Sequence, residues 1–73
     1  MTVEIRIESV RPVSGQPRWQ AQVRKLLVDD LWGKWHPWND TKKTRAEAFA
    51  DAEQAKTYYD YTMGWEVIKN GYR

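Results

Sequence analysis

The chain has no cysteine among its 73 residues, and this absence removes several kinds of site at once. Disulfide bonds and thiolate metal sites are excluded, and a reducing cytosol fits such a composition. The sequence also lacks an apolar run long enough to cross a membrane. Its first ten residues alternate charged and apolar side chains, which is not the pattern of a signal peptide. We therefore expect a cytoplasmic protein.

Groups for catalysis are also scarce. His36 is the only histidine, its neighbours Trp35 and Pro37 are apolar, and there is no cysteine to pair with it. Asp29 and Asp30 are adjacent, so in a strand their side chains would point apart, and they are typical of a turn. Because no nucleophile, base and orienting group can be assembled from neighbouring positions, we expect a non-enzymatic protein with no metal or cofactor.

Charge of one sign does not dominate the chain. Twelve basic and ten acidic residues give a net charge of +2. The sequence has no basic tail of the kind that is typical of nucleic-acid-binding proteins. Aromatic residues, in contrast, are abundant, with five Trp and four Tyr beside one Phe. Trp and Tyr are favoured on surfaces that are partly exposed to solvent, as in protein interfaces. The composition therefore directs attention to contact surfaces.

Alternation of apolar and polar side chains predicts the strands. It is clear in Thr2–Val10 and in Arg18–Val28. The alternation slips at residues 26–28, which predicts a bulge or burial of both faces. A short third strand is expected over residues 34–39, at a sheet edge because it contains a proline. A fourth is expected over residues 64–71.

One helix is predicted between the third and fourth strands. The sequence TRAE from Thr44 to Glu47 has the form of a capping box, in which Thr44 caps a backbone amide and Glu47 reaches back. Gly64 supplies a left-handed stop. The apolar face of the helix follows from helical spacing and comprises Ala48, Phe49, Ala52, Ala55, Tyr59 and Met63.

The order β-β-β-α-β predicts a single α+β domain over residues 1–73. We expect an antiparallel sheet of three or four strands with one helix packed on one face. The predicted core consists of Val3, Ile5, Ile7, Trp19, Ala21, Val23, Phe49, Ala52, Ala55, Tyr59, Trp65 and Val67.

The segment LWGKWHPWND holds three tryptophans spaced three residues apart, Trp32, Trp35 and Trp38. In an extended chain Trp32 and Trp38 point one way and Trp35 the other, so the three cannot share one core face. Two interpretations stay open. The tryptophans form either an exposed binding surface, since tryptophan is a frequent hot-spot residue, or a small aromatic cluster over the sheet edge.

Cations surround the predicted helix start, where the helix dipole favours anions. Lys42, Lys43 and Arg45 indicate either solubilising charge or a site where helix amides and three cations bind phosphate or carboxylate. The end of the sequence is either a frayed tail or a continuation of the last strand that presents charge and a ring to a partner. The residues concerned are Lys69, Tyr72 and Arg73.

Three short motifs carry a resemblance to a known family: WQAQV at residues 19–23, TRAEA at residues 44–48 and GWEV at residues 64–67. In these motifs the chain resembles small lytic-phage proteins that bind the host's multisubunit RNA polymerase, in particular the T7-type inhibitor. Its size is also similar to that of the short inhibitor and antiterminator of a Xanthomonas phage. In the T7-type protein a basic residue two positions beyond the Glu-Val pair helps to contact the polymerase, and Lys69 has that position here.

The resemblance implies a regulator that docks on a subunit of host RNA polymerase in the bacterial cytoplasm and inhibits initiation or modifies termination. We expect it to act as a monomer, without membrane contact, and with nucleic acid only as a secondary partner. The expected surface joins the aromatic segment to the cations and comprises Trp32, Trp35, Trp38, Lys42, Lys43, Arg45, Lys69 and Arg73.

A second resemblance leads to a different function. The arm-binding domains of tyrosine recombinases and plant AP2 domains also place three strands before one helix, and they read DNA with the sheet. This resemblance implies that Arg18, Arg24 and Lys34 face phosphates while tryptophans lie against sugars and bases. The even charge balance counts against it, because DNA affinity comes largely from phosphate neutralisation. A small stability or assembly factor without nucleic acid is a third alternative.

Overall fold

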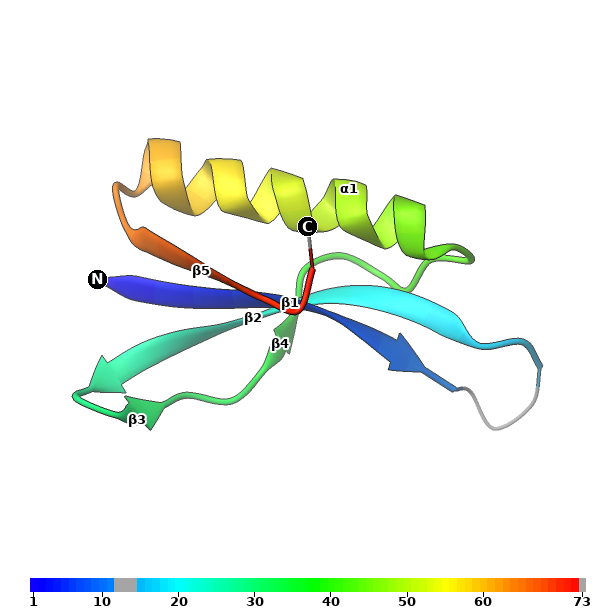
Figure 1. The fold of residues 1–73 in the computed structure, drawn as a ribbon, viewed down its shortest axis with the longest axis horizontal. Helices are drawn as coiled ribbons and strands as arrows, with labels where there is room; N and C mark the ends of the chain where they lie inside the picture. Colours follow the sequence, from blue (N-terminus) through cyan, green and yellow to red (C-terminus); the bar gives the residue numbers. More distant parts are fainter. Residues whose placement is uncertain (12–14, 73) are drawn as a thin grey trace.

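The computed structural model describes residues 1–11 and 15–72 and has an α+β fold. One α-helix covers one face of a sheet, which confirms the predicted class (Figure 1). Part of the predicted loop after the first strand and Arg73 lie outside the described residues. The elements in chain order are β1 (Thr2–Val10), β2 (Arg18–Val28), β3 (Leu31–Trp32), β4 (His36–Pro37), α1 (Arg45–Thr57), the π-helical turn η1 (Tyr58–Thr62) and β5 (Glu66–Asn70).

The sheet is mixed, with the strand order β3-β2-β1-β5 and with β4 also paired to β2. The long strands β1 and β2 form an antiparallel hairpin, whereas β5 lies parallel to β1. The prediction of a wholly antiparallel sheet is therefore wrong for the last strand. The reason is visible in Figure 1, where α1 returns the chain to the end of the molecule at which β1 begins.

The predicted third strand is shortened to β4, and a further short strand, β3, precedes it. Leu26 pairs with Trp32 in β3, and the pairs of β4 are Gln22 with Pro37 and Val23 with His36. Residues 33–35 between the two pairings belong to no strand. The predicted bulge is confirmed, because the register of β2 against β3 shifts between Leu26 and Val28. The chain thus leaves the sheet between Trp32 and His36.

The predicted helix cap is confirmed. The Thr44 hydroxyl accepts a hydrogen bond from the Glu47 backbone amide (3.2 Å) and donates one to the Glu47 carboxylate (2.9 Å). Glu47 therefore reaches back to the side chain of Thr44. After α1 the chain widens into η1, and Gly64 then has the positive φ (68°) expected of a left-handed stop.

The core lies between the sheet and α1. The buried cluster contains Val3, Ile5, Ala21, Val23, Ala52, Ala55, Tyr59 and Tyr72, with Ile7, Trp38, Phe49, Trp65 and Val67 packed against it. Most of the predicted core is confirmed, but Trp19 is only half-buried and lies outside the cluster. Trp19 sits near the start of β2, where its backbone pairs with Lys42 in the segment that leads to α1.

For Tyr72, both interpretations of the chain end are wrong. Its side chain is only 4% exposed, so it is neither frayed nor presented to a partner. The ring packs edge-to-face against Phe49 of α1, with 5.8 Å between the ring centroids. Gly71 has a φ of 75°, and at this residue the chain turns out of β5 and brings the ring of Tyr72 under the helix.

Candidate binding surfaces

The three tryptophans of the central segment separate onto two faces of the sheet. Trp38 lies on the α1 side, where its indole N–H donates to the Gln54 side chain (3.2 Å) and its ring packs against Tyr59. Trp32 and Trp35 stack on arginines of the opposite face. The expected grouping of Trp32 with Trp38 is wrong because the chain is not continuously extended between them.

Trp32 and Trp35 form a stack with Arg6 and Arg24, which we call the Trp–Arg stack. The Arg6 guanidinium lies 4.1 Å from the centre of the Trp35 ring. The Arg24 guanidinium lies 4.6 Å from Trp32 and 4.7 Å from Trp35. Arg6 and Arg24 alternate with the buried Ile5 and Val23, so they project from the face opposite α1. Each arginine is therefore held against an indole ring.

Carboxylates on β1 neutralise both arginines of the stack. Arg24 is paired with Glu4, whose side chain is largely buried, and Arg6 lies 3.4 Å from Glu8. Arg6 also donates to the Gln22 side chain (2.9 Å). The Arg18 guanidinium donates hydrogen bonds to the hydroxyl and to the backbone carbonyl oxygen of Thr41. The arginines that a sheet would need for binding DNA are thus already bound to other side chains and to the backbone of this protein.

Replacing Trp35 by alanine is expected to lower the free energy of unfolding by about 1–2 kcal/mol, because Trp35 is stacked with two guanidinium groups. Trp35→Phe keeps a ring at this place and should lose less. Urea denaturation monitored by far-UV circular dichroism measures both variants. Equal stability of Trp35→Ala and the wild-type protein would show that the stack does not stabilise the fold.

Two cations of the predicted surface, Lys42 and Lys69, lie on the α1 side, apart from the Trp–Arg stack. The Lys42 ammonium lies 3.7 Å from Asp51, and the Lys69 ammonium lies 3.7 Å from Glu53. Lys43 is exposed, and Arg45 occupies the first position of α1. The predicted cations and tryptophans therefore do not form one continuous surface. Nor do the three cations at the helix start converge, since Lys42 is held by Asp51.

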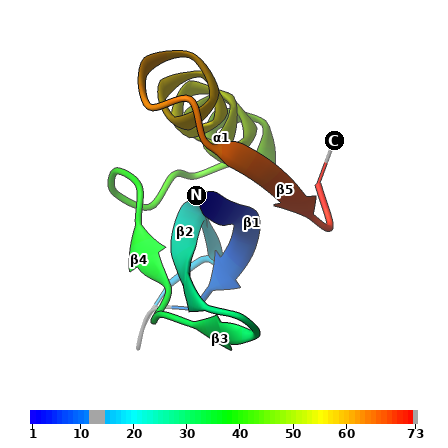
Figure 2. The same ribbon diagram turned by 90° about the vertical axis from the view of Figure 1, so that its left-hand side faces the viewer.

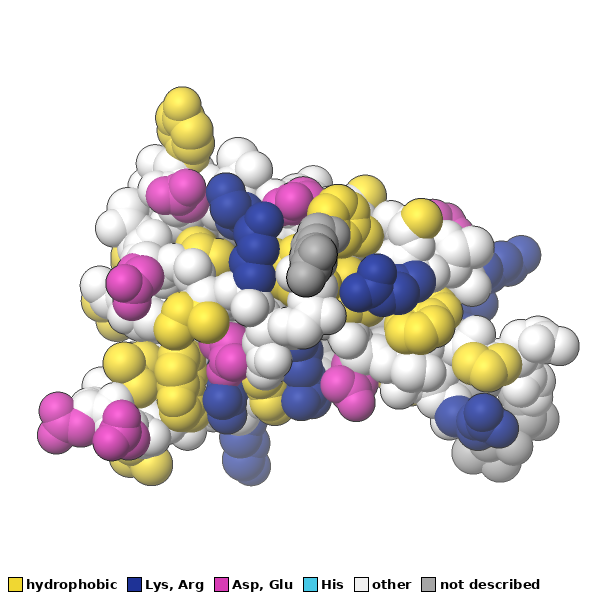
Figure 3. All heavy atoms as spheres, viewed as in Figure 1, with side chains coloured by type: hydrophobic (Ala, Val, Ile, Leu, Met, Phe, Trp, Pro, Cys, Tyr) yellow, Lys and Arg dark blue, Asp and Glu magenta, His cyan; other side chains and the backbone are white. Residues whose placement is uncertain are grey.

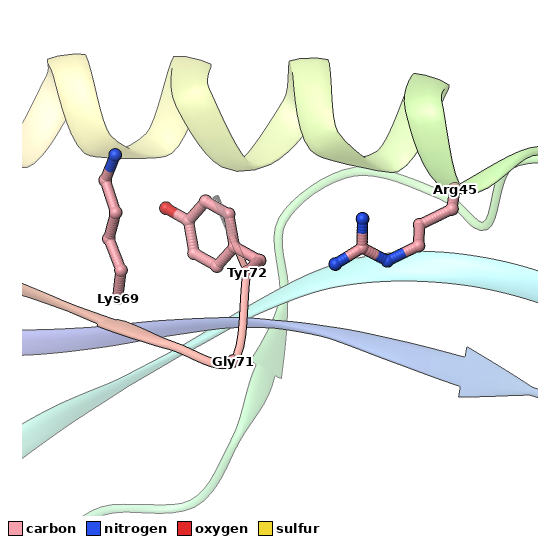
Figure 4. Close-up of a pocket in the computed structure, with 4 residues that line it drawn as sticks. All are labelled: Arg45, Lys69, Gly71 and Tyr72. Atoms are coloured by element: carbon pink, nitrogen blue, oxygen red, sulfur yellow. The ribbon is translucent and has the colours of Figure 1, made fainter.

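Arg45 and Lys69 line an open pocket of about 540 Å³ together with Gly71 and Tyr72. Figure 4 shows their cationic groups on either side of the Tyr72 ring. Burial, and then the nearby Glu53 carboxylate, raises the pKa of Tyr72 to about 12, so its hydroxyl is neutral at neutral pH. The pocket can attract a carboxylate or a phosphate, but Glu53 offsets the charge of Lys69.

The exposed apolar side chains form a surface that sequence reasoning missed. Leu27, Val28 and Leu31 are 61%, 63% and 60% exposed on the hairpin that joins β2 to β3. The sequence at residues 26–28 predicts a bulge or burial of both faces. The bulge is present but the burial is not, because β1 pairs only as far as Lys25 and does not cover the hairpin.

Other exposed apolar residues lie at the same end of the molecule. Met1 is held beside the start of β5 by a backbone hydrogen bond from Glu66 (2.8 Å), and Met63 precedes β5. In Figure 1 the hairpin, the N-terminus and the end of the helix all lie on the left. Figure 3 shows hydrophobic side chains over the hairpin, with acidic ones beyond them. Figure 2 shows the end of the helix and the hairpin on opposite sides of β1, so we restrict the name apolar end to Leu27, Val28 and Leu31 on the hairpin.

Comparison with known protein families, curated proteins and solved structures finds no match. Within residues 1–11 and 15–72, no group of three or more His, Cys, Asp or Glu side chains is placed to hold a metal ion. In the same ranges, no helix is long and apolar enough to cross a membrane.

Proposed function

We propose that this chain is a non-enzymatic binding protein that docks on another protein through its apolar end. The observation that carries this proposal is the exposure of Leu27, Val28 and Leu31 on one hairpin. A host bacterial RNA polymerase is the proposed partner, as the sequence resemblance implies, and altered transcription is the proposed result.

The apolar end has the chemistry of a protein contact. Aliphatic side chains that gather on a surface gain free energy when a partner removes them from water. Asp29 and Asp30 form the turn between β2 and β3, so two negative charges border the apolar side chains. Such charges orient a partner whose apolar groove is rimmed by cations. The hairpin projects from the sheet, so it can enter a groove without rearrangement of the core (Figure 1).

Sheet-mediated DNA binding receives less support from the same structure. Arg24 is paired with Glu4 and Arg6 with Glu8, so phosphate contacts by these arginines would require existing ion pairs to break. Arg18 is hydrogen-bonded to Thr41. Neutralisation of phosphates supplies most of the affinity in DNA binding, and paired arginines supply little of it. A protein partner is therefore the better proposal.

The test is affinity capture of purified bacterial RNA polymerase on the immobilised protein, with and without nuclease. Capture should persist after nuclease treatment. The double variant Leu27→Thr/Leu31→Thr should bind at least about tenfold more weakly, because two exposed anchors are removed. Leu27→Met/Leu31→Met keeps both positions apolar and should bind like the wild-type protein.

Each part of the proposal can fail separately. Absence of polymerase capture would remove the polymerase as partner. Loss of capture after nuclease treatment would support nucleic-acid binding in place of a direct protein contact. Equal capture of the threonine and methionine variants would show that the apolar end is not the interface.

A further inference from the structure

β5 is the last strand in the sheet order, so one of its edges has no neighbour within the described residues. The Glu66 amide donates to the Met1 carbonyl oxygen, and therefore the backbone groups of Glu66 point towards β1. Backbone groups alternate in direction along a strand, so those of Val67 and Lys69 point outwards. Figure 2 shows β5 on the side of β1 away from β2. The outer edge thus presents two amide N–H groups and two carbonyl oxygens.

A second copy of β5 can satisfy all four of these groups in one register. In an antiparallel pair centred on Ile68, Val67 of each copy lies opposite Lys69 of the other, and both pairs exchange two hydrogen bonds. Centring on Val67 would need Trp65, whose amide is already bonded to Tyr59. Centring on Lys69 would place two ammonium-bearing residues opposite each other. Only the register centred on Ile68 pairs every outward backbone N–H and C=O group of Val67 and Lys69 without placing two lysines opposite each other.

The side chains of β5 fit the same register. Ile68 is 40% exposed on the sheet face opposite α1, and at the two-fold axis it would meet its own copy. Glu66 of one copy would lie opposite Asn70 of the other. Charged side chains commonly protect a sheet edge, but the Lys69 ammonium is drawn towards α1 by Glu53, 3.7 Å away. The edge is therefore open to pairing.

We propose that two copies of this chain join β5 to β5 in antiparallel fashion around a two-fold axis at Ile68. The two sheets become one continuous sheet, in place of the monomer that the sequence predicts. The pairing leaves the apolar ends free and directs them away from each other. It does not depend on the proposed function, since it uses a different edge of the molecule.

Sedimentation velocity over concentrations up to the millimolar range tests this pairing. The wild-type protein should form a dimer. Lys69→Pro removes an outward amide without removing a hydrogen bond to β1, and should raise the dimer dissociation constant by about tenfold or more. Lys69→Ala is the matched control, because it loses the same side chain and the ion pair to Glu53 but keeps the amide. It should remain a dimer.

Ile68→Lys gives a second measurement if the proline variant does not fold. It places two positive charges at the axis on an exposed position and should also yield monomers, with an unchanged circular dichroism spectrum. A wild-type protein that is monomeric at every concentration would overturn the proposal. So would a dimer that persists in Ile68→Lys, or one that is lost in Leu27→Thr/Leu31→Thr, because that dimer would use the apolar end.

Discussion

The Tyr59→Ala variant is expected to lose about 3–5 kcal/mol of its free energy of unfolding. Tyr59 is only 7% exposed, and its ring packs against Trp65 (5.2 Å between centroids) and Trp38 (5.8 Å). Truncation removes these contacts and leaves a cavity at the place where η1 meets the sheet. A domain of this size is stable by only about 4–11 kcal/mol, so a large share of its stability depends on this ring.

Tyr61→Ala provides a control within the same π-helical turn. Tyr61 is 88% exposed, and its loss should change stability by less than about 0.5 kcal/mol. Urea denaturation of both variants, observed by tryptophan fluorescence and far-UV circular dichroism, gives the comparison. If the two variants were equally stable, the aromatic packing around Tyr59 would not be a main support of the fold.

Replacement of Ile5 by alanine should cost about 2–5 kcal/mol. Ile5 is fully buried in β1, the strand that pairs with both β2 and β5, and it faces α1. The cavity would therefore lie at the centre of the sheet, where neighbouring strands have little freedom to close it.

Ile68→Ala makes the same chemical change on an exposed position of β5 and serves as the control for Ile5→Ala. It should cost less than about 0.5 kcal/mol when measured at concentrations where the protein is monomeric. The difference in urea midpoint between the two alanine variants isolates the effect of burial. A small difference would contradict the placement of Ile5 in the core.

Local features of the fold could be predicted because local chemistry determines them. In β1 and β2 one face packs on α1 and the other does not, so the alternation of their side chains is evident. The Thr44 cap involves residues only three positions apart. The direction of β5 could not be predicted, because alternation is the same in parallel and antiparallel strands. Only the path of α1 across the sheet determines it.

The binding surfaces were less predictable because they join residues from distant parts of the chain. The positions of Trp32 and Trp35 depend on where pairing with β2 stops, and their partner Arg6 comes from another strand. The exposure of Leu27 depends on the length of β1, which is not evident from the residues around Leu27. A run of apolar residues is compatible with burial and with a contact surface, and only tertiary structure separates the two.

The parallel pairing of β1 with β5 also affects when the domain can form. The Thr2 hydroxyl donates to the Glu66 carboxylate (3.3 Å), although the two residues are 64 positions apart. During synthesis the β1–β2 hairpin emerges first, while α1, which covers its apolar face, and β5, which pairs with the edge of β1, are still to come. Pairing between such distant segments is slow to form and leaves apolar surface open to other contacts meanwhile. Folding of this domain is therefore completed only after β5 has left the ribosome.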